Sequence, residues 1–489
     1  MPYILQAVIR LPSGETLSAA ERYGLALLVD LARLPSVEDA DADVVRLDIA
    51  ARDEGGADPD LPTCIAHDWY LERGDGAVRV LRAALRQITA VAGAAAEHRT
   101  AARDRYGRVP SLENALVRHG LDTEPVVSHA AARLRTAVLA SAGRRRVVLA
   151  TPWPEGKRWA AALTHDLDVV AYWPLFTLLR LAELARKGQL GRCGRTLGAA
   201  LTAVGRDPVG QGIRTVLDTE RHYGVVSTWF VLCGTPTLAT MRAGDLTYVP
   251  ESPPAAAIVR SLMEHGCEIG LHGSFATAER PELFREQRAR LERLAGRPVA
   301  GVRQHFLRIQ PAVTQQAMLA GGFRYDATAG FPDRNGFRLG VADVIPAWDP
   351  GAERPIGLEE VPLCWMDRAL SKYRGVEEPE RWVAEGLALA RACQEAEGLW
   401  VGVWHPNLTA PLGFPGAPTA FAELVRGVTG GAPFLGTLAA LVRWRVARRS
   451  VRIRRVAPDG RVEAYTALPT PAPLALEDAA GRTLEPVRA

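Results

Sequence analysis

Short strand-like runs that end in polar residues recur through the middle of the chain. The run 159–163 is apolar and unbroken, which is typical of a strand buried on both faces of a sheet. Further strand-like runs occupy 225–232, 299–302 and 399–403, and helical patterns at 281–294 and 379–397 separate them. The second helical pattern has proline in its first turn and is followed by a glycine stop, Gly398. Alternation of this kind predicts an α/β fold around parallel strands.

Two further regions flank this central one. Residues 1–155 mix strand-like pieces (3–11 and 146–150) with helical ones (19–34 and 77–95), and are expected to form an α/β domain whose role the sequence does not reveal. Residues 449–489 begin with two alternating runs, 450–456 and 461–465, across Pro458-Asp459-Gly460, which predicts a β-hairpin. A proline-rich connector follows at 468–473. No internal repeat is evident.

An insertion at 172–205 interrupts the central pattern after the first strand. It opens with an amphipathic helix from 173 to 181 and is basic through Arg180, Arg186, Lys187, Arg192 and Arg195. A helix that packs on the barrel is one interpretation. A lid over the site, or a contact with a lipid-linked or anionic substrate, is the other.

Composition narrows the class of protein. The chain has 489 residues, enough for about two or three domains, and its 59 basic and 55 acidic residues imply no general attraction to nucleic acid. Six cysteines without paired spacing suit a reducing compartment. Residues 1–6 lack the pattern of a signal peptide, and no apolar run is long enough to span a bilayer. We therefore expect a cytoplasmic protein, with peripheral membrane contact left open.

Seven arginines lie between Arg443 and Arg455. Nucleic-acid binding is one interpretation, but the aromatic pattern of single-strand binders does not accompany them. A solvated strand face, or docking on the acidic surface of another domain, is the alternative that we favour.

The strongest chemical signal is the pair Asp166 and Asp168 at the end of the first strand. Side chains two apart on a strand point the same way. Two carboxylates at such a short distance repel each other, which costs free energy unless a cation lies between them or one of them takes a proton. A divalent metal held by one carboxylate, with the other acting as a general base, would remove this cost, although the pair on its own is more often explained without a metal. Solvated acids in a turn are the simpler alternative.

Other polar groups follow the later strand-like runs. They are Leu271-His272-Gly273-Ser274, Arg303-Gln304-His305-Phe306, Tyr325-Asp326-Ala327-Thr328 and Trp404-His405-Pro406. Barrels of parallel strands place their chemistry at the carboxyl ends of the strands. The sequence therefore predicts that these groups converge with Asp166 and Asp168.

This series of motifs resembles the polysaccharide deacetylase family (NodB homology, carbohydrate esterase 4) over about residues 156–448, and is most similar to bacterial members with Thr-His-Asp-x-Asp and Gly-Val-Arg-Gln-His motifs. The resemblance implies a NodB-type distorted (β/α) barrel, here with an N-terminal α/β domain and a short C-terminal β extension. It also implies the following roles: Asp166 as base, Asp168 and His272 as metal ligands, Arg303 as the residue that orients the base, His405 as general acid and Asp326 as the residue that tunes His405.

The chain departs from the family in its second motif. The family usually carries two histidines at i and i+4, but the later position here is Ala276. Catalytic zinc usually has three protein ligands and a water, so Asp168 and His272 would not suffice. His305 is the expected third ligand. His165 is the alternative, although it should point to the opposite side of its strand; a pocket-lining role for His305, or a decayed metal site, also stays open.

The resemblance implies a metal-dependent deacetylase that hydrolyses an N-acetyl amide on an amino sugar, glycan or glycoconjugate, with zinc as the default metal. Phe306, Tyr325 and Trp404 are the expected substrate contacts. The alternatives are a metal-dependent hydrolase of another small amide or ester, and a non-catalytic glycan-binding protein on the same scaffold.

Overall fold

The structure is a computed structural model of the whole chain. It describes residues 3–4, 7–10, 16–37, 45–49, 65, 71–74, 77–142, 146–172, 174–242, 244–456, 462–466, 476–478, 483–484 and 486–488.

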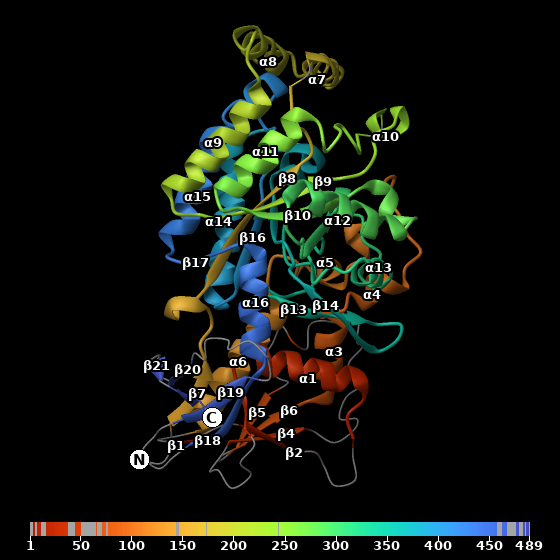
Figure 1. Ribbon diagram of the computed structural model, residues 1–489. Helices are drawn as coiled ribbons and strands as arrows, with labels where there is room; N and C mark the ends of the chain where they lie inside the picture. Colours follow the sequence, from red (N-terminus) through yellow and green to blue (C-terminus); the bar gives the residue numbers. More distant parts are fainter. Residues whose placement is uncertain are drawn as a thin grey trace.

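A curled, almost entirely parallel sheet of ten strands forms the centre of the molecule (Figure 1). Its order is β13 (Ile345–Asp349), β14 (Arg354–Glu360), β12 (Tyr325–Asp326), β11 (Gly301–Gln304), β10 (Glu268–Gly273), β9 (Thr228–Leu232), β8 (Ala160–Leu167), β16 (Leu399–Val403) and β15 (Trp365–Met366), and β17 (Phe434–Leu435) also pairs with β8. Only β13 and β14 pair antiparallel. Within the described residues the two outer strands, β13 and β15, do not pair, so the barrel is open. The predicted α/β class and distorted barrel are confirmed.

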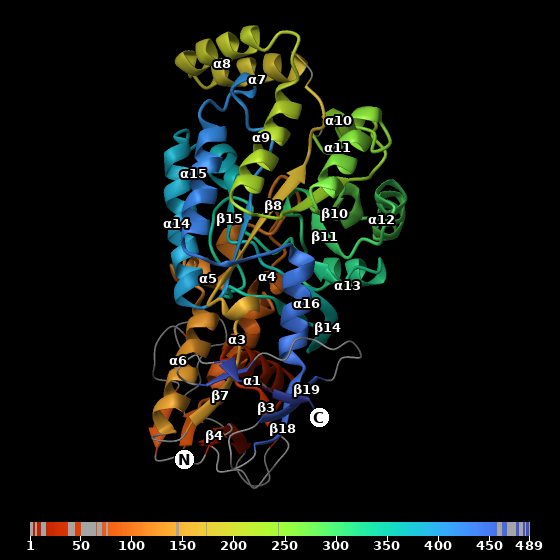
Figure 2. The same ribbon diagram turned by 60° about the vertical axis from the view of Figure 1, so that its left-hand side comes forward.

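Helices surround this sheet, as Figure 2 shows from a second side. They are α9 (Pro208–His222), α10 (Leu238–Arg242), α11 (Pro253–Glu264), α12 (Glu282–Ala295), α13 (Val313–Ala320), α14 (Pro379–Glu395) and α15 (Ala417–Gly430). The helices predicted at 281–294 and 379–397 are α12 and α14. Proline does open α14, where its missing N–H costs nothing.

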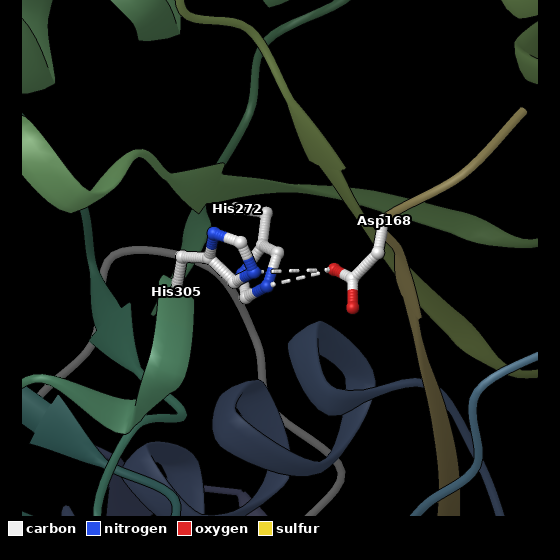
Figure 3. A group of neighbouring side chains, drawn as sticks. All are labelled: Asp168, His272 and His305. Carbon is white, nitrogen blue, oxygen red and sulfur yellow. Dashed lines mark ion pairs between the residues drawn. The ribbon is translucent and has the colours of Figure 1, made fainter. Parts of the chain in front are cut away.

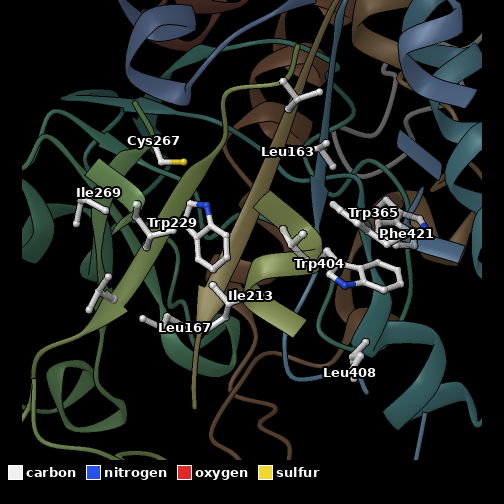
Figure 4. Packing of buried hydrophobic residues seen from close by; sticks show 14 of the residues in the cluster. Leu163, Leu167, Ile213, Trp229, Cys267, Ile269, Trp365, Trp404, Leu408 and Phe421 are labelled. Atoms are coloured by element: carbon white, nitrogen blue, oxygen red, sulfur yellow. The ribbon is translucent and has the colours of Figure 1, made fainter. Parts of the chain in front are cut away.

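Both faces of the parallel strands are buried, and side chains alternate between them. Leu163 and Trp229 belong to the large core cluster that also holds residues of the surrounding helices such as Phe421 (Figure 4). The alternate residues of β8, Ala160 and Ala162, belong to a different core cluster, which lies on the inner face of the curl. The even-numbered residues of β8, which have the same parity as Ala160 and Ala162, therefore point toward the inside of the barrel.

The N-terminal region packs against one end of the barrel. Its helices are α1 (Ala19–Leu31), α3 (Arg82–Ala92), α4 (Ala95–Arg99), α5 (Ala115–Arg118) and α6 (Val126–Ser141), and its strands are β1 (Tyr3–Ile4), β2 (Ala7–Arg10), β3 (Ser36–Val37), β4 (Val45–Ile49), β5 (Leu71–Gly74), β6 (Ala77–Val80) and β7 (Arg146–Ala150). The single helix predicted over 77–95 is wrong at its start. Residues 77–80 alternate in burial as a strand does, and α3 begins only at Arg82.

The C-terminal region joins the N-terminal one. The predicted hairpin is confirmed as β18 (Val451–Val456) paired antiparallel with β19 (Val462–Thr466), while its turn and the connector at 468–473 lie outside the described residues. Strand β18 also pairs with β3, and β20 (Leu476–Asp478) pairs with β7; β21 (Thr483–Leu484) and β22 (Pro486–Arg488) complete these sheets. The two ends of the chain thus share sheets.

Helix α16 (Leu438–Arg449) connects the barrel to these sheets and carries part of the arginine run. Arg445 pairs with Asp30 and Asp343, and Arg449 pairs with Asp30 and Glu359. These arginines dock on acidic groups of other segments, which was the favoured interpretation.

The insertion forms a helical hairpin, α7 (Pro174–Arg186) and α8 (Leu190–Thr202), at the end of the molecule opposite the two termini (Figure 1). It packs on η7 (Ala410–Leu412). Several of its leucines are exposed, namely Leu178, Leu179, Leu190, Leu197 and Leu201. None of the described helices has the length and apolarity needed to cross a membrane. Peripheral contact through this hairpin stays a prediction.

Candidate active site

Strand β8 delivers two carboxylates to the inner face of the barrel. Asp166 and Asp168 share the parity of Ala160 and Ala162, so they point inward where the strand ends. His165 has the opposite parity, and its ring nitrogens contact the Trp404 carbonyl and Glu220 Oε1, each at 2.8 Å. With both nitrogens occupied in the core, His165 cannot serve as a ligand at this site.

Asp168, His272 and His305 form a cluster whose ligand atoms all lie within 4.8 Å of one another. Asp168 Oδ1 lies 3.5 Å from His272 Nε2 and 3.7 Å from His305 Nε2 (Figure 3). These residues follow or end β8, β10 and β11, so β9 separates the aspartate from the two histidines. His305, the expected third ligand, therefore lies beside Asp168 and His272 and could take the place of the histidine that the second motif lacks at Ala276.

The chemistry of this cluster fits a divalent metal. His272 Nδ1 donates to the Arg303 carbonyl oxygen, and His305 Nδ1 donates to Asp245 Oδ1, each at 2.8 Å. Both rings therefore present an unprotonated Nε2 to the same point when neutral, an arrangement that ligating histidines use. Asp168 Oδ1 is buried without a hydrogen-bond partner in the described structure. A cation held by these three groups would satisfy that oxygen.

Asp166 is held by an arginine. Arg303 Nη1 donates to Asp166 Oδ1 at 2.8 Å, and its Nε donates to the Ala327 carbonyl, which fixes the fully buried guanidinium. The other carboxylate oxygen, Oδ2, lies 3.7 Å from His272 Nε2 and 3.9 Å from His405 Nε2. Burial alone would raise the pKa of Asp166, but the positive charges of Arg303, His272 and His405 together outweigh burial and hold the pKa below its usual range.

His405 follows β16 and is fixed by Asp367. The His405 ring donates from Nδ1 to Asp367 Oδ1, and its backbone N–H donates to Asp367 Oδ2, both at 2.6 Å. Its Nε2 then faces the two aspartates, 3.8 Å from Asp168 Oδ2. Burial would lower the pKa of His405, but Asp367, with Asp168 and Asp166, outweighs burial and raises the pKa above its ordinary value.

The predicted contact between Asp326 and His405 is wrong. Asp326 Oδ1 instead accepts a hydrogen bond from the Thr328 backbone N–H at 2.8 Å, and Asp326 lies in register with Glu360 of β14. Strand β12 lies between β11 and β14, whereas His405 follows β16 on the far side of β8. Burial raises the pKa of Asp326 to about 7 and that of Glu360 well above its usual range, so this pair is not held as two carboxylates.

A cavity of about 250 Å³ opens over these groups, and Asp166, Asp168, His272, His305 and His405 all line it. A larger cavity of about 430 Å³, between α1 and the start of β18, is mostly apolar. Among the described residues the metal-type cluster lies only at the smaller cavity, so the chemistry identifies the smaller one as the candidate active site.

Of the three predicted substrate contacts, Phe306 lines the cavity and two residues do not. Tyr325 is buried and donates its hydroxyl to Glu268 Oε1 at 2.7 Å. Trp404 points into the outer core beside Trp365 and Phe421 (Figure 4). Because Trp404 directly precedes the inward-facing His405, strand alternation sends it outward.

The N-terminal region supplies part of the cavity wall. Tyr106 and Arg108 line it, and Tyr106 stacks on Phe306 with ring centroids 5.2 Å apart. Arg108 Nη1 donates to the Phe306 carbonyl and to the Tyr373 hydroxyl. The N-terminal region thus contributes residues to the candidate site, a role that its sequence does not reveal.

Two functional carboxylates were missed by sequence reasoning. Asp367 ends the strand-like stretch 359–367, so the rule that found the other residues also applies to it. Asp245 lies in the loop after α10, between two strands, and no pattern in the sequence distinguishes it.

No protein-family model matches the chain, and no curated protein matches it. Solved structures with similar folds include two proteins assigned as polysaccharide deacetylases. The one from Mycobacterium smegmatis has 20% identity and a TM-score of 0.40, over 62% of this chain and 95% of that chain. The one from Pseudomonas aeruginosa PAO1 has 17% identity and a TM-score of 0.39, over 62% and 96%. PuuE allantoinase has 14% identity and a TM-score of 0.38, over 60% and 92%.

Proposed function

We propose that this protein is a metal-dependent hydrolase that removes an N-acetyl group from an amino sugar, a glycan or a glycoconjugate. The observation that carries the proposal is one arrangement: an arginine-held carboxylate, Asp166, and an aspartate-held histidine, His405, both lie next to the Asp168, His272 and His305 cluster. A base and an acid next to a metal site are the parts that amide hydrolysis needs.

In this proposal each residue of the site has its own role in the reaction. A divalent cation bound by Asp168, His272 and His305 would supply Lewis acidity toward an acyl oxygen and water. Asp166 Oδ2 takes a proton from the attacking water as the water oxygen bonds to the acyl carbon, while Arg303 keeps Oδ1 in place. The acyl carbon–nitrogen bond then breaks, and His405 gives its Nε2 proton to the nitrogen, because an amide nitrogen does not leave as an anion. The products are acetate and the free amine.

The proposal is tested by metal analysis combined with an acetate-release assay. We expect the purified protein to contain one tightly bound divalent metal, zinc by default, and to release acetate from at least one member of a panel of N-acetyl sugars. The panel includes lipid-linked sugars, and a set of small amides is assayed beside it. Metal without acetate release from any sugar, but with release from another amide, would redirect the function to a different amide. Absence of a bound metal and of hydrolysis would leave a glycan-binding role.

His305→Ala should weaken zinc binding more than Asp245→Asn does. The first change removes a proposed ligand, whereas the second removes only the carboxylate that orients it, a change that typically costs about 10–100-fold in metal affinity. Zinc affinity is measured by competition with a chromophoric chelator. Unchanged affinity in His305→Ala would mean that His305 contacts substrate and not the metal.

A further inference from the structure

One wall of the cavity carries two cations that lack an acidic partner of their own. Arg368 and Lys372 both line the cavity, and neither makes a hydrogen bond or close ion pair with another described residue. Two carboxylates act on Arg368 through their charge: both oxygens of Asp367 are used by His405, and Asp168, which also acts on Lys372, belongs to the metal-type cluster. Arg108, the third cation of this wall, is by contrast paired with Asp104 at 2.7 Å.

The backbone places these two cations together. Arg368 precedes a π-helical turn, η6 (Ala369–Arg374), and Lys372 lies within it. Hydrogen bonds in a π-turn close from i to i+5, so residues four apart lie near the same face. Such turns are rare and often occur at functional sites. The turn begins directly after Asp367, which fixes His405, so the cations lie on the same short segment as the partner of the proposed acid.

The neighbours of both side chains are aromatic. Lys372 Nζ lies 5.2 Å from the ring centre of Phe306, 5.4 Å from that of Tyr373 and 5.6 Å from that of Tyr106. Arg368 lies 5.3 Å from the ring centre of Phe414. Aromatic faces attract cations but do not neutralise them. Partial removal from water in the cavity is the largest cause that lowers the pKa of Lys372 to about 8, and the charge of Arg368 adds to it.

We propose that Arg368 and Lys372 bind an acidic substituent, a carboxylate or a phosphate, that the substrate carries beside its acylated amine. Charge-assisted hydrogen bonds from guanidinium and ammonium groups are the usual means of recognising such anions. The proposal rests on the proposed function for the amino-sugar part of the substrate. It narrows the substrate class from any N-acetylated sugar to acidic ones.

The test measures binding in the Asp166→Asn protein, so that hydrolysis does not interfere. Calorimetry compares N-acetylglucosamine, which is neutral, with N-acetylmuramic acid, which carries a carboxylate, and N-acetylglucosamine 6-phosphate. We expect at least one acidic sugar to bind about tenfold or more tightly than the neutral one, the effect of one charge-assisted hydrogen bond. The acidic sugar that binds more tightly shows whether the site prefers a carboxylate or a phosphate.

Arg368→Gln and Lys372→Gln should each reduce this preference, and Lys372→Arg should retain it. The control is Arg426→Gln, which removes one charge from an exposed residue of α15 and should leave the preference intact. Retained affinity for the neutral sugar shows that each variant is folded. Equal affinity for neutral and acidic sugars, no binding of either acidic sugar, or a preference that survives both glutamine variants overturns the proposal.

Failure of the proposed function gives a different result. If the wild-type protein releases no acetate from any sugar while the binding preference persists and depends on Arg368, the anion site stands and the deacetylase function falls.

Discussion

Asp166→Asn should lower kcat by about 10²–10⁴-fold, the usual contribution of a general base, while the metal content stays unchanged. Asparagine keeps an oxygen to accept the hydrogen bond from Arg303, but it cannot take a proton at the position of Oδ2. Asp168→Asn should lose both metal and turnover, because Asp168 Oδ1 faces both histidines of the cluster. Acetate release and metal analysis on the two variants check the expectation.

The comparison is informative because the two aspartates are close. Asp166 Oδ2 lies 3.7 Å from His272 Nε2, hardly farther than the 3.5 Å of Asp168 Oδ1, so distance alone does not separate base from ligand. Arg303 separates them, since it occupies one oxygen of Asp166 and leaves Asp168 free. Equal loss of metal in both variants would make Asp166 a ligand. A thermal melt of each variant excludes unfolding as the cause.

Much of the site was predicted from the sequence by the rule that parallel barrels carry their chemistry at the carboxyl ends of the strands. Asp166, Asp168, His272, Arg303, His305 and His405 all lie where parallel strands end, and the structure brings them around one cavity. The alternation of side chains along a strand argued against His165, which stayed an alternative ligand, and the structure excludes it because both ring nitrogens bond in the core. The same alternation places Trp404 in the outer core, beside Trp365 and Phe421 and outside the cavity.

The partner of His405 could not be found in this way. Asp326 and Asp367 both follow strand-like runs, and local sequence does not tell which strand lies beside β16. In the sheet, Met366 of β15 pairs with Val403 of β16, so Asp367 emerges beside His405. Strand β12 takes its place beyond β11, which carries Asp326 away. Strand order is a property of the whole sheet, and it decided this assignment.

Contributions from outside the barrel were also beyond the sequence. Tyr106 and Arg108 reach the cavity from an N-terminal loop with no periodic pattern, and Asp245 reaches His305 from the loop after α10. These contacts join segments far apart in the chain. The same holds for the sheets that combine the first and last strands, which the sequence presented as separate regions.

His405→Ala should abolish amide hydrolysis, by about 10²–10⁴-fold, and change the hydrolysis of an activated aryl acetate far less. An amine needs a proton to leave, whereas a phenolate leaves without one. The structure supports this role because Asp367 fixes Nδ1 and the backbone N–H of His405, which leaves Nε2 directed at the cavity. Acetate release from the amide and phenolate release from the ester are measured on the same preparation.

A matched pair of variants tests which aspartate supports the acid. Asp367→Asn should reduce the amide rate more than the ester rate, in the same direction as His405→Ala, because it disturbs the hydrogen bonds that orient the ring. Asp326→Asn should leave the ratio of the two rates unchanged, since Asp326 bonds to Thr328 and pairs in register with Glu360. If His405→Ala lowers both rates equally, His405 holds the metal or the fold. If only Asp326→Asn shifts the ratio, the assignment of Asp367 is wrong.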